Sequence, residues 1–133
     1  MRLENKVAIV TGGASGLGEA TAKLFAAEGA KVIIADVLEQ EGREIEAEIS
    51  ETGGIGLFVR LDVTDENQWE EVVATAVSRF GKLDALVNNA GISGSDPDMT
   101  NTVAWDRLME INAKGVFLGV KTAIPELRKG GGG

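Results

Sequence analysis

A glycine-rich segment is the part of this chain best suited to bind a phosphate-containing ligand. Residues 11–18 read Thr-Gly-Gly-Ala-Ser-Gly-Leu-Gly and lie between a short apolar run, Val7–Val10, and a segment with helical periodicity. Where a strand turns into a helix, free backbone N–H groups and the helix dipole favour an anion. Glycines let the backbone turn sharply and approach that anion without a Cβ in the way. The pattern predicts a phosphate site, and a merely tight turn is the simpler alternative.

The spacing of these glycines separates classes of nucleotide-binding protein. Gly13 and Gly18 have the spacing of the outer glycines of a P-loop, but Glu19 and Ala20 follow where Lys and Ser or Thr are needed. From Gly12 onward the glycines follow G-x-x-x-G-x-G and not the strict dinucleotide pattern G-x-G-x-x-G. Triphosphate hydrolysis is therefore not expected. A dinucleotide-binding protein and an S-adenosylmethionine-dependent methyltransferase, which also has a glycine-rich first loop, both stay open.

Asp36 is an acid placed at the end of the next apolar run, Val32–Ala35, and 20 residues after Gly16. A carboxylate at this point can accept hydrogen bonds from ribose hydroxyls, and it would repel a 2′-phosphate. No Arg or Lys occurs in residues 12–18 or directly after Asp36. The predicted cofactor is therefore NAD(H) and not NADP(H). The alternative is that Asp36 only caps the helix that follows it.

Composition removes several kinds of chemistry. The chain has 133 residues, no His, Cys or Tyr, and 13 Lys and Arg against 21 Asp and Glu, for a formal net charge of −8. Nucleophilic triads with His, zinc bound by His or Cys, disulfide scaffolds and Tyr acid/base chemistry all need absent side chains. No metal site is predicted, because the glutamates of residues 39–51 fit the solvated face of a helix. The acidic balance argues against nucleic-acid and anionic-membrane partners.

The length predicts one domain, and no apolar run approaches the ~18 residues typical of a membrane span. The first residues, Met1–Lys6, are charged and lead into a short apolar run without the hydrophobic region of a signal peptide. We therefore expect a cytoplasmic protein.

Apolar runs and helical periods alternate along the whole chain. Strands are predicted at Val7–Val10, Val32–Ala35, Ile55–Leu61 and Leu83–Asn88, and helices at residues 17–27, 38–51, 65–80 and 102–127, with a loop at 89–101. Such alternation with short connections predicts right-handed crossovers and a parallel sheet. The expected fold class is α/β, an incomplete Rossmann-type doubly wound sheet of about four strands in the order 3-2-1-4, with helices on both faces.

Helical spacing also predicts which side chains are buried. The first helix shows a stripe of Leu17, Ala20, Leu24 and Ala27. Asp65 and Gln68 resemble a capping box, and Trp69 falls on the apolar face of the helix that follows. Residues 102–127 are apolar on more than one side, which predicts burial against the sheet and against a second subunit, hence a homo-oligomer.

Four segments, in this order, resemble the short-chain dehydrogenase/reductase family. They are the loop T-G-x-x-x-G-x-G at residues 11–18, the dipeptide Asp62-Val63, the N-N-A-G segment at residues 88–91, and Asn112 within a helix. The methyltransferase alternative does not account for the last two. The resemblance implies a Rossmann domain that binds NAD through Gly12, Ser15, Gly16, Leu17, Gly18, Asp36, Val37, Asp62, Val63, Asn89, Ala90 and Gly91.

The resemblance also implies how the reaction is divided along the chain. Members of the family are roughly twice as long, and their second half supplies a Ser, a Tyr and a Lys for proton transfer during secondary alcohol/ketone interconversion. Asn112 corresponds to the helix Asn of that active site, where it holds the water and helix geometry of the proton relay. We therefore expect residues 1–129 to be the NAD-binding half, residues 130–133 to be a glycine tail or truncation point, and the chain alone to be inactive.

Two further roles stay open from the sequence. The chain could be a stand-alone or engineered nucleotide-binding module without catalysis. It could also serve chiefly in assembly, through the helical region at 102–127.

Overall fold

The computed structural model describes residues 1–93, 96–98 and 100–132. The elements are β1 (Val7–Thr11), α1 (Gly16–Ala27), β2 (Lys31–Asp36), α2 (Glu39–Glu51), β3 (Ile55–Arg60), α3 (Glu66–Phe80), β4 (Ala85–Val87), α4 (Thr102–Met109), the π-helical segment η1 (Glu110–Lys114) and α5 (Gly115–Lys129). Parts of the predicted loop at 89–101, namely residues 94, 95 and 99, and the predicted tail residue Gly133 lie outside the described residues.

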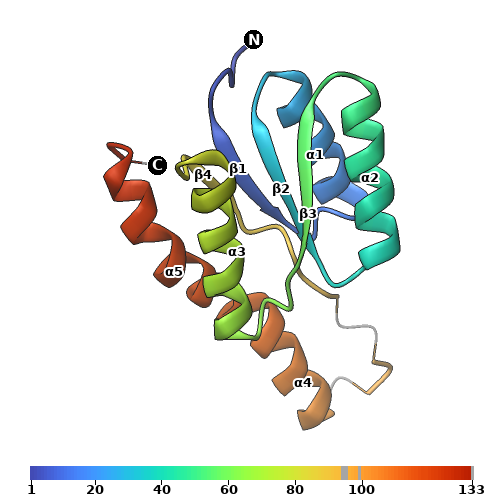
Figure 1. Cartoon of the computed structure of the whole chain (residues 1–133). Coiled ribbons are helices and arrows are strands. Elements are labelled where there is room, and N and C mark those ends of the chain that lie inside the picture. Colours follow the sequence, from blue (N-terminus) through green and yellow to red (C-terminus); the bar gives the residue numbers. More distant parts are fainter. Residues whose placement is uncertain (94–95, 99, 133) are drawn as a thin grey trace.

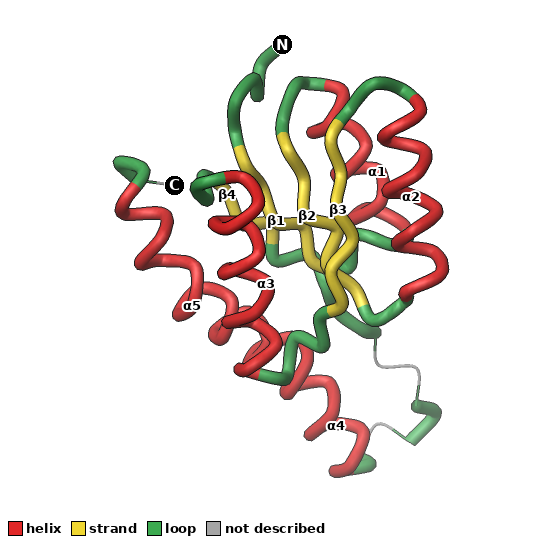
Figure 2. The backbone as a smooth tube through the Cα atoms, in the orientation of Figure 1, coloured by secondary structure: helices red, strands yellow, loops and turns green. Residues whose placement is uncertain are grey.

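The strands form a parallel sheet in the order β3-β2-β1-β4, which confirms the predicted fold class and strand order. Helices α1 and α2 cover one face, and α3 and α5 cover the other (Figure 1). The carboxyl ends of the strands meet at one edge of the sheet, and α4 extends beyond that edge (Figure 2). This edge is where open α/β sheets bind ligands.

The sheet divides the core into two layers, because alternate residues of each strand point to opposite faces. In β1, Val7 and Ile9 pack toward α3 and α5, whereas Val10 packs toward α1 and α2. Both kinds of residue are buried, as the continuous apolar runs of the sequence predict. Trp69 lies in the layer between the sheet and helices α3 and α5 and has no exposed surface, which confirms its predicted place in the core.

The prediction for the first helix is wrong. The stripe of Leu17, Ala20, Leu24 and Ala27 faces solvent, with Leu17 81% and Leu24 60% exposed, and the small residues Gly18, Ala22 and Ala26 are buried instead. The physical reason is the short distance between the helix and the loop before it. A Cβ at Gly18 would lie 2.0 Å from the carbonyl oxygen of Gly12, so no larger residue fits there.

The start of α3 follows the predicted capping pattern in part. Asp65 is the N-cap, and its carboxylate accepts a hydrogen bond from the backbone N–H of Gln68 at 3.1 Å. The side-chain oxygen of Gln68 accepts from the N–H of Asp62 at 2.7 Å, and not from that of the cap residue as in the standard box. The helix start therefore also fixes the segment that follows β3.

Residues 102–127 do not form one regular helix. The π-helical turns of η1 separate α4 from α5, and such turns change the direction of the side chains that follow. Gly115 and Gly119 then allow α5 to approach the rest of the molecule closely. A Cβ at Gly115 would lie 2.8 Å from a methyl carbon of Val63, and one at Gly119 would lie 2.7 Å from the ring of Trp69.

The fourth strand is shorter than the predicted Leu83–Asn88, since only Ala85–Val87 pair with β1. Leu83 is nevertheless fully buried in the core. Asp84 accepts a hydrogen bond from the N–H of Val7 at 2.8 Å, which ties the start of β1 to this segment. Among the described residues, no helix has the length and apolar character that crossing a membrane requires.

Candidate nucleotide-binding site

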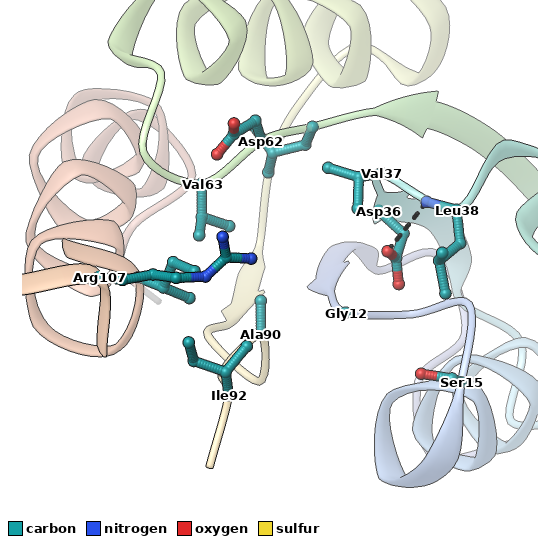
Figure 3. A pocket seen from close by; sticks show the side chains of 13 residues that line it. Gly12, Ser15, Asp36, Val37, Leu38, Asp62, Val63, Ala90, Ile92 and Arg107 are labelled. Atoms are coloured by element: carbon teal, nitrogen blue, oxygen red, sulfur yellow. Dashed lines mark hydrogen bonds between the residues drawn. The ribbon is translucent and has the colours of Figure 1, made fainter. Parts of the chain in front are cut away.

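A cavity of about 320 Å³ opens at the carboxyl edge of the sheet (Figure 3). Its walls come from the loops after all four strands and from α4 and η1. The lining residues are Gly12, Ser15, Asp36, Val37, Leu38, Leu61, Asp62, Val63, Ala90, Gly91, Ile92, Arg107 and Ile111. The volume falls at the lower end of the range for small-molecule sites, which is about 300–1,000 Å³.

Thr11 joins the loops after β1 and β4. Its buried hydroxyl oxygen accepts hydrogen bonds from the N–H groups of Asn89 and Ala90, each at 3.0 Å. In return, the side-chain amide of Asn89 donates to the carbonyl of Thr11 at 3.1 Å and to that of Gly12 at 3.4 Å. Thr11 and Asn89 thus hold the two loops at a fixed separation, although neither residue lines the cavity itself.

The glycines of residues 12–18 meet two different demands. Gly12 has a φ of +64°, and a Cβ there would lie 2.9 Å from the amide nitrogen of Asn89, so the loop requires glycine for both conformation and space. Gly16 has a φ of +53°, but no atom lies within 4 Å of where its Cβ would be. The backbone at Gly16, the first residue of α1, therefore has open space where a side chain would lie.

Ser15 occupies the N-cap position of α1 but makes no side-chain capping bond. Its hydroxyl lines the cavity. The first N–H groups of a helix have no intrahelical partners, and α1 leaves them next to this hydroxyl. A hydroxyl beside free helix N–H groups is an arrangement that suits an anion, and phosphate binding at this point stays a prediction.

The carboxylate of Asp36 lies in the cavity and holds the glycine loop. One oxygen accepts from the N–H of Ala14 at 3.0 Å, and the other accepts from the N–H of Leu38 at 3.2 Å. Asp36 is only 8% exposed. The N-cap of α2 is Leu38 and not Asp36, so the alternative role of Asp36 as a helix cap is wrong. Each carboxylate oxygen keeps further lone-pair capacity for a ligand hydroxyl.

Asp62 is the second carboxylate of the cavity. One of its oxygens accepts from the hydroxyl of Thr64 at 2.7 Å and from the N–H of Thr64 at 2.9 Å. These bonds hold the pKa of the Asp62 carboxyl below its usual value, because their effect outweighs that of burial, which raises the pKa. The charges of Arg60 and Arg107 lower the pKa further, each by less than the Thr64 bonds. Asp62 is therefore ionised at neutral pH.

Asn112 lies in the π-helical segment η1, and both polar groups of its side chain are hydrogen-bonded to the backbone of Ile92. The amide oxygen accepts from the N–H of Ile92 at 2.8 Å, and the amide nitrogen donates to the carbonyl of Ile92 at 2.7 Å. A Cβ at Gly91 would lie 3.2 Å from the same amide oxygen. Asn112 therefore fixes the segment after N-N-A-G and does not line the cavity.

The structure brings most of the predicted cofactor residues to one cavity. Those that line it are Gly12, Ser15, Asp36, Val37, Asp62, Val63, Ala90 and Gly91. Gly16, Leu17, Gly18 and Asn89 do not line it. Gly18 and Asn89 shape the backbone behind the wall, whereas Leu17 faces solvent.

Five lining residues were not predicted from the sequence. They are Leu38, Leu61, Ile92, Arg107 and Ile111. Leu38 and Ile92 directly follow the predicted residues Val37 and Gly91, and Leu61 directly precedes Asp62, so an apolar residue beside a predicted site residue was the available signal. Ile111 has the same signal, because it directly precedes Asn112. Arg107 has none, because it reaches the cavity only through the position of α4. Within the described part of the chain, no three His, Cys, Asp or Glu residues are grouped to hold a metal ion.

Comparison with known proteins shows the family. Residues 6–133 match the family described as short chain dehydrogenase. The chain belongs to the short-chain dehydrogenase family. Members of this family use the nicotinamide cofactor NAD or NADP. Membership also decides against the methyltransferase alternative.

Three relatives illustrate the similarity. The 2,5-dichloro-2,5-cyclohexadiene-1,4-diol dehydrogenase LinX of Sphingobium indicum is 49% identical over 99% of this chain and 53% of its own length. The trans-4-hydroxycyclohexanecarboxylate dehydrogenase of Sinomonas cyclohexanicum is 47% identical over 98% of this chain and 53% of its own length. The cyclopentanol dehydrogenase of Comamonas testosteroni is 46% identical over 96% of this chain and 52% of its own length. The short-chain dehydrogenase chain described here spans about half the length of these relatives.

Proposed function

We propose that this chain is the NAD(H)-binding half of a short-chain dehydrogenase that interconverts a secondary alcohol and a ketone. The observation that carries the proposal is the position of Asp36. Its carboxylate lies in the cavity within hydrogen-bonding distance of the glycine loop, at Ala14. A ribose-binding acid and a phosphate-binding loop are thus joined in one site.

The residues at and beside the cavity fit the successive parts of a dinucleotide. The hydroxyl of Ser15 in the cavity wall and the open backbone at Gly16, just outside the lining, suit the pyrophosphate. Asp36 suits the hydroxyls of the adenosine ribose. Asp62 and Val63 suit the adenine, and Ala90 and Gly91 extend the site toward the nicotinamide. NAD bound here would supply the hydride acceptor of the reaction, and the residues of this chain would hold and orient it.

The same residues favour NAD over NADP. A 2′-phosphate would bring negative charge next to the Asp36 carboxylate, which is buried and therefore poorly screened by solvent. Arg60 is paired with Asp36 in the register of β2 and β3, but its guanidinium donates to the carbonyl of Val37 at 3.0 Å. The nearest basic residue of the sheet thus stabilises the loop after β2 and would have to leave it to bind a phosphate.

The substrate proposal rests on the relatives. Three of them are named for a cyclohexadienediol, a hydroxycyclohexanecarboxylate and cyclopentanol, so we propose an alcohol on a small carbon ring. The chain contains no Tyr, the residue that the family resemblance assigns to proton transfer. Asn112 supports the site by holding Ile92. We propose that the 133 residues bind cofactor without turning over substrate.

Calorimetric titration with NAD⁺ and NADP⁺, followed by an assay with cyclopentanol, tests this proposal. We expect saturable binding of NAD⁺, at least about tenfold weaker binding of NADP⁺, and no formation of NADH by a preparation of confirmed mass. Turnover by that preparation would contradict the division of roles. Binding without turnover by a longer natural protein that contains this chain would favour the alternative of a nucleotide-binding module.

We also propose that α4 and α5 form a subunit interface. Large apolar side chains are exposed along both helices: Val103 is 77% exposed, Trp105 62%, Phe117 62% and Val120 42%. Exposed apolar surface of this kind is typical of association sites. Light scattering should show a dimer or larger species that Phe117→Asp reduces to a monomer. A monomer at all concentrations would contradict the proposal.

A further inference from the structure

Arg107 is the one basic residue among the described residues that line the cavity. It belongs to the first helix beyond the carboxyl edge of the sheet, α4. Figure 3 shows its side chain extending from α4 toward the middle of the cavity, with Val63 on one side and Ala90 and Ile92 on the other. Neither the sequence pattern nor the family comparison assigns it a role.

The guanidinium of Arg107 acts on its surroundings through its charge, which contributes to lowering the pKa of Asp62. Within the described part of the chain it forms no side-chain hydrogen bond or ion pair, whereas Lys114, further along the same helical region, pairs with Glu110 at 3.0 Å. An unpaired arginine on an open helix face would normally extend into solvent. Here it extends between the apolar side chains of Val63 and Ile92 (Figure 3).

The position of Arg107 separates it from the phosphate end of the site. Gly12 and Ser15 lie across the cavity from it, next to the start of α1 (Figure 3). On its own side the cavity presents the Asp62 carboxylate and aliphatic side chains. This surface suits a flat, hydrogen-bonding ring and not an anion. A guanidinium is planar and weakly hydrated, and it stacks favourably on aromatic rings.

We propose that Arg107 is a cofactor-binding residue that stacks its guanidinium on the adenine ring and closes the outer side of the adenine subsite. The inference rests on the proposed function, because it requires that the cavity bind an adenine nucleotide. It adds a contact from α4, so that adenine is held between the sheet edge and a helix distant in sequence. The guanidinium would then lie over the face of the bound adenine, and the adenine would be the stacking partner of Arg107.

The test compares Arg107→Gln with Arg128→Gln, which removes the same charge from an exposed position near the end of α5. Binding of adenosine, AMP and nicotinamide mononucleotide is measured by calorimetry for both variants and the parent chain. We expect Arg107→Gln to weaken adenosine and AMP by about three- to thirtyfold. Its affinity for nicotinamide mononucleotide, and all affinities of Arg128→Gln, should stay within about twofold of the parent.

Neutral adenosine distinguishes stacking from charge. If Arg107→Gln weakens AMP but leaves adenosine unchanged, Arg107 acts on the phosphate and the inference is wrong. If the parent chain binds NADH and neither adenine ligand weakens in the variant, the inference is also wrong, while the proposed function stands. If the parent chain binds no adenine ligand, both fail. Arg107→Lys, which keeps the charge but not the planar group, should weaken adenosine as well, and thermal unfolding confirms that each variant is folded.

Discussion

The carboxylate of Asp36 accepts a hydrogen bond from the backbone N–H of Ala14 at 3.0 Å. This bond connects the end of β2 to the loop after β1, so the residue proposed to bind ribose also fixes the loop proposed to bind phosphate. Because both functions depend on one side chain, substitutions at Asp36 should affect cofactor binding more than global stability.

We predict that Asp36→Asn and Asp36→Ala separate these functions. Asparagine keeps an oxygen that can accept from Ala14 but loses the charge, whereas alanine loses both. Hydrogen bonds to charged groups contribute about 1.5–3 kcal/mol, so NADH affinity should fall about tenfold or more in the alanine variant and less in the asparagine variant. The preference for NADH over NADPH should also shrink in both. Fluorescence titration measures these affinities, and an unchanged preference would contradict the assignment of Asp36.

Gly18→Ala should destabilise the fold strongly. Its Cβ would lie 2.0 Å from the carbonyl oxygen of Gly12, which is backbone and cannot rotate away. Overpacking of this kind costs about 2–4 kcal/mol. The matched control is Gly16→Ala, where the positive φ costs about 1 kcal/mol but no atom blocks the side chain. Urea unfolding should show a larger loss of unfolding free energy for Gly18→Ala than for Gly16→Ala. Equal or reversed losses would show that the close contact at Gly18 is not a constraint.

Asn112→Ala should loosen the backbone after N-N-A-G. It removes both hydrogen bonds to Ile92, at a cost of about 1–3 kcal/mol. Hydrogen exchange at the Ile92 amide should become faster, while exchange in β1 changes only by the global loss of stability. Asn112→Asp keeps the acceptor and serves as the control, with slower exchange than the alanine variant. An unchanged exchange rate at Ile92 in both variants would rule out this positioning role.

The pKa of Asp62 predicts a dependence of stability on pH. Because hydrogen bonds from Thr64 lower its pKa in the folded state, its ionised form stabilises the fold above about pH 4. This contribution is lost as the pH falls through the folded-state pKa. Thr64→Val removes one of those bonds, so the pKa of Asp62 should rise. The difference in unfolding free energy between parent and variant should be larger at pH 7 than near ~pH 2. A difference independent of pH would contradict this cause of the shift.

The sequence predicts the sheet well because its central strands are buried on both faces. Val7–Val10 and Val32–Ala35 are uninterrupted apolar runs, and their order with the intervening helices leads to the parallel 3-2-1-4 sheet. The shared cavity of Gly12 and Asp36 could be predicted for a related reason, because the ends of adjacent parallel strands must meet at one edge. Their role in binding a cofactor stays a prediction.

Other features of the fold depend on distances between elements, which the spacing of apolar residues in the sequence does not predict. Leu17 and Leu24 have helical spacing, but the inward face of α1 is the one with small residues, since Gly18 must pass close to Gly12. The π-helical turns at Asn112 have no sequence signal, and without them the direction of α4 cannot be predicted. Arg107 was missed for that reason, because only the position of α4 brings it to the cavity.

The most direct test of the account is a fluorescence titration of the chain with NADH and NADPH, with AMP as competitor. The account predicts one saturable NADH site per chain, displacement by AMP, and NADPH binding at least about tenfold weaker. Absence of saturable NADH binding by folded protein, or NADPH binding as tight as that of NADH, would contradict the central claim that Asp36 and the glycine loop form an NAD site.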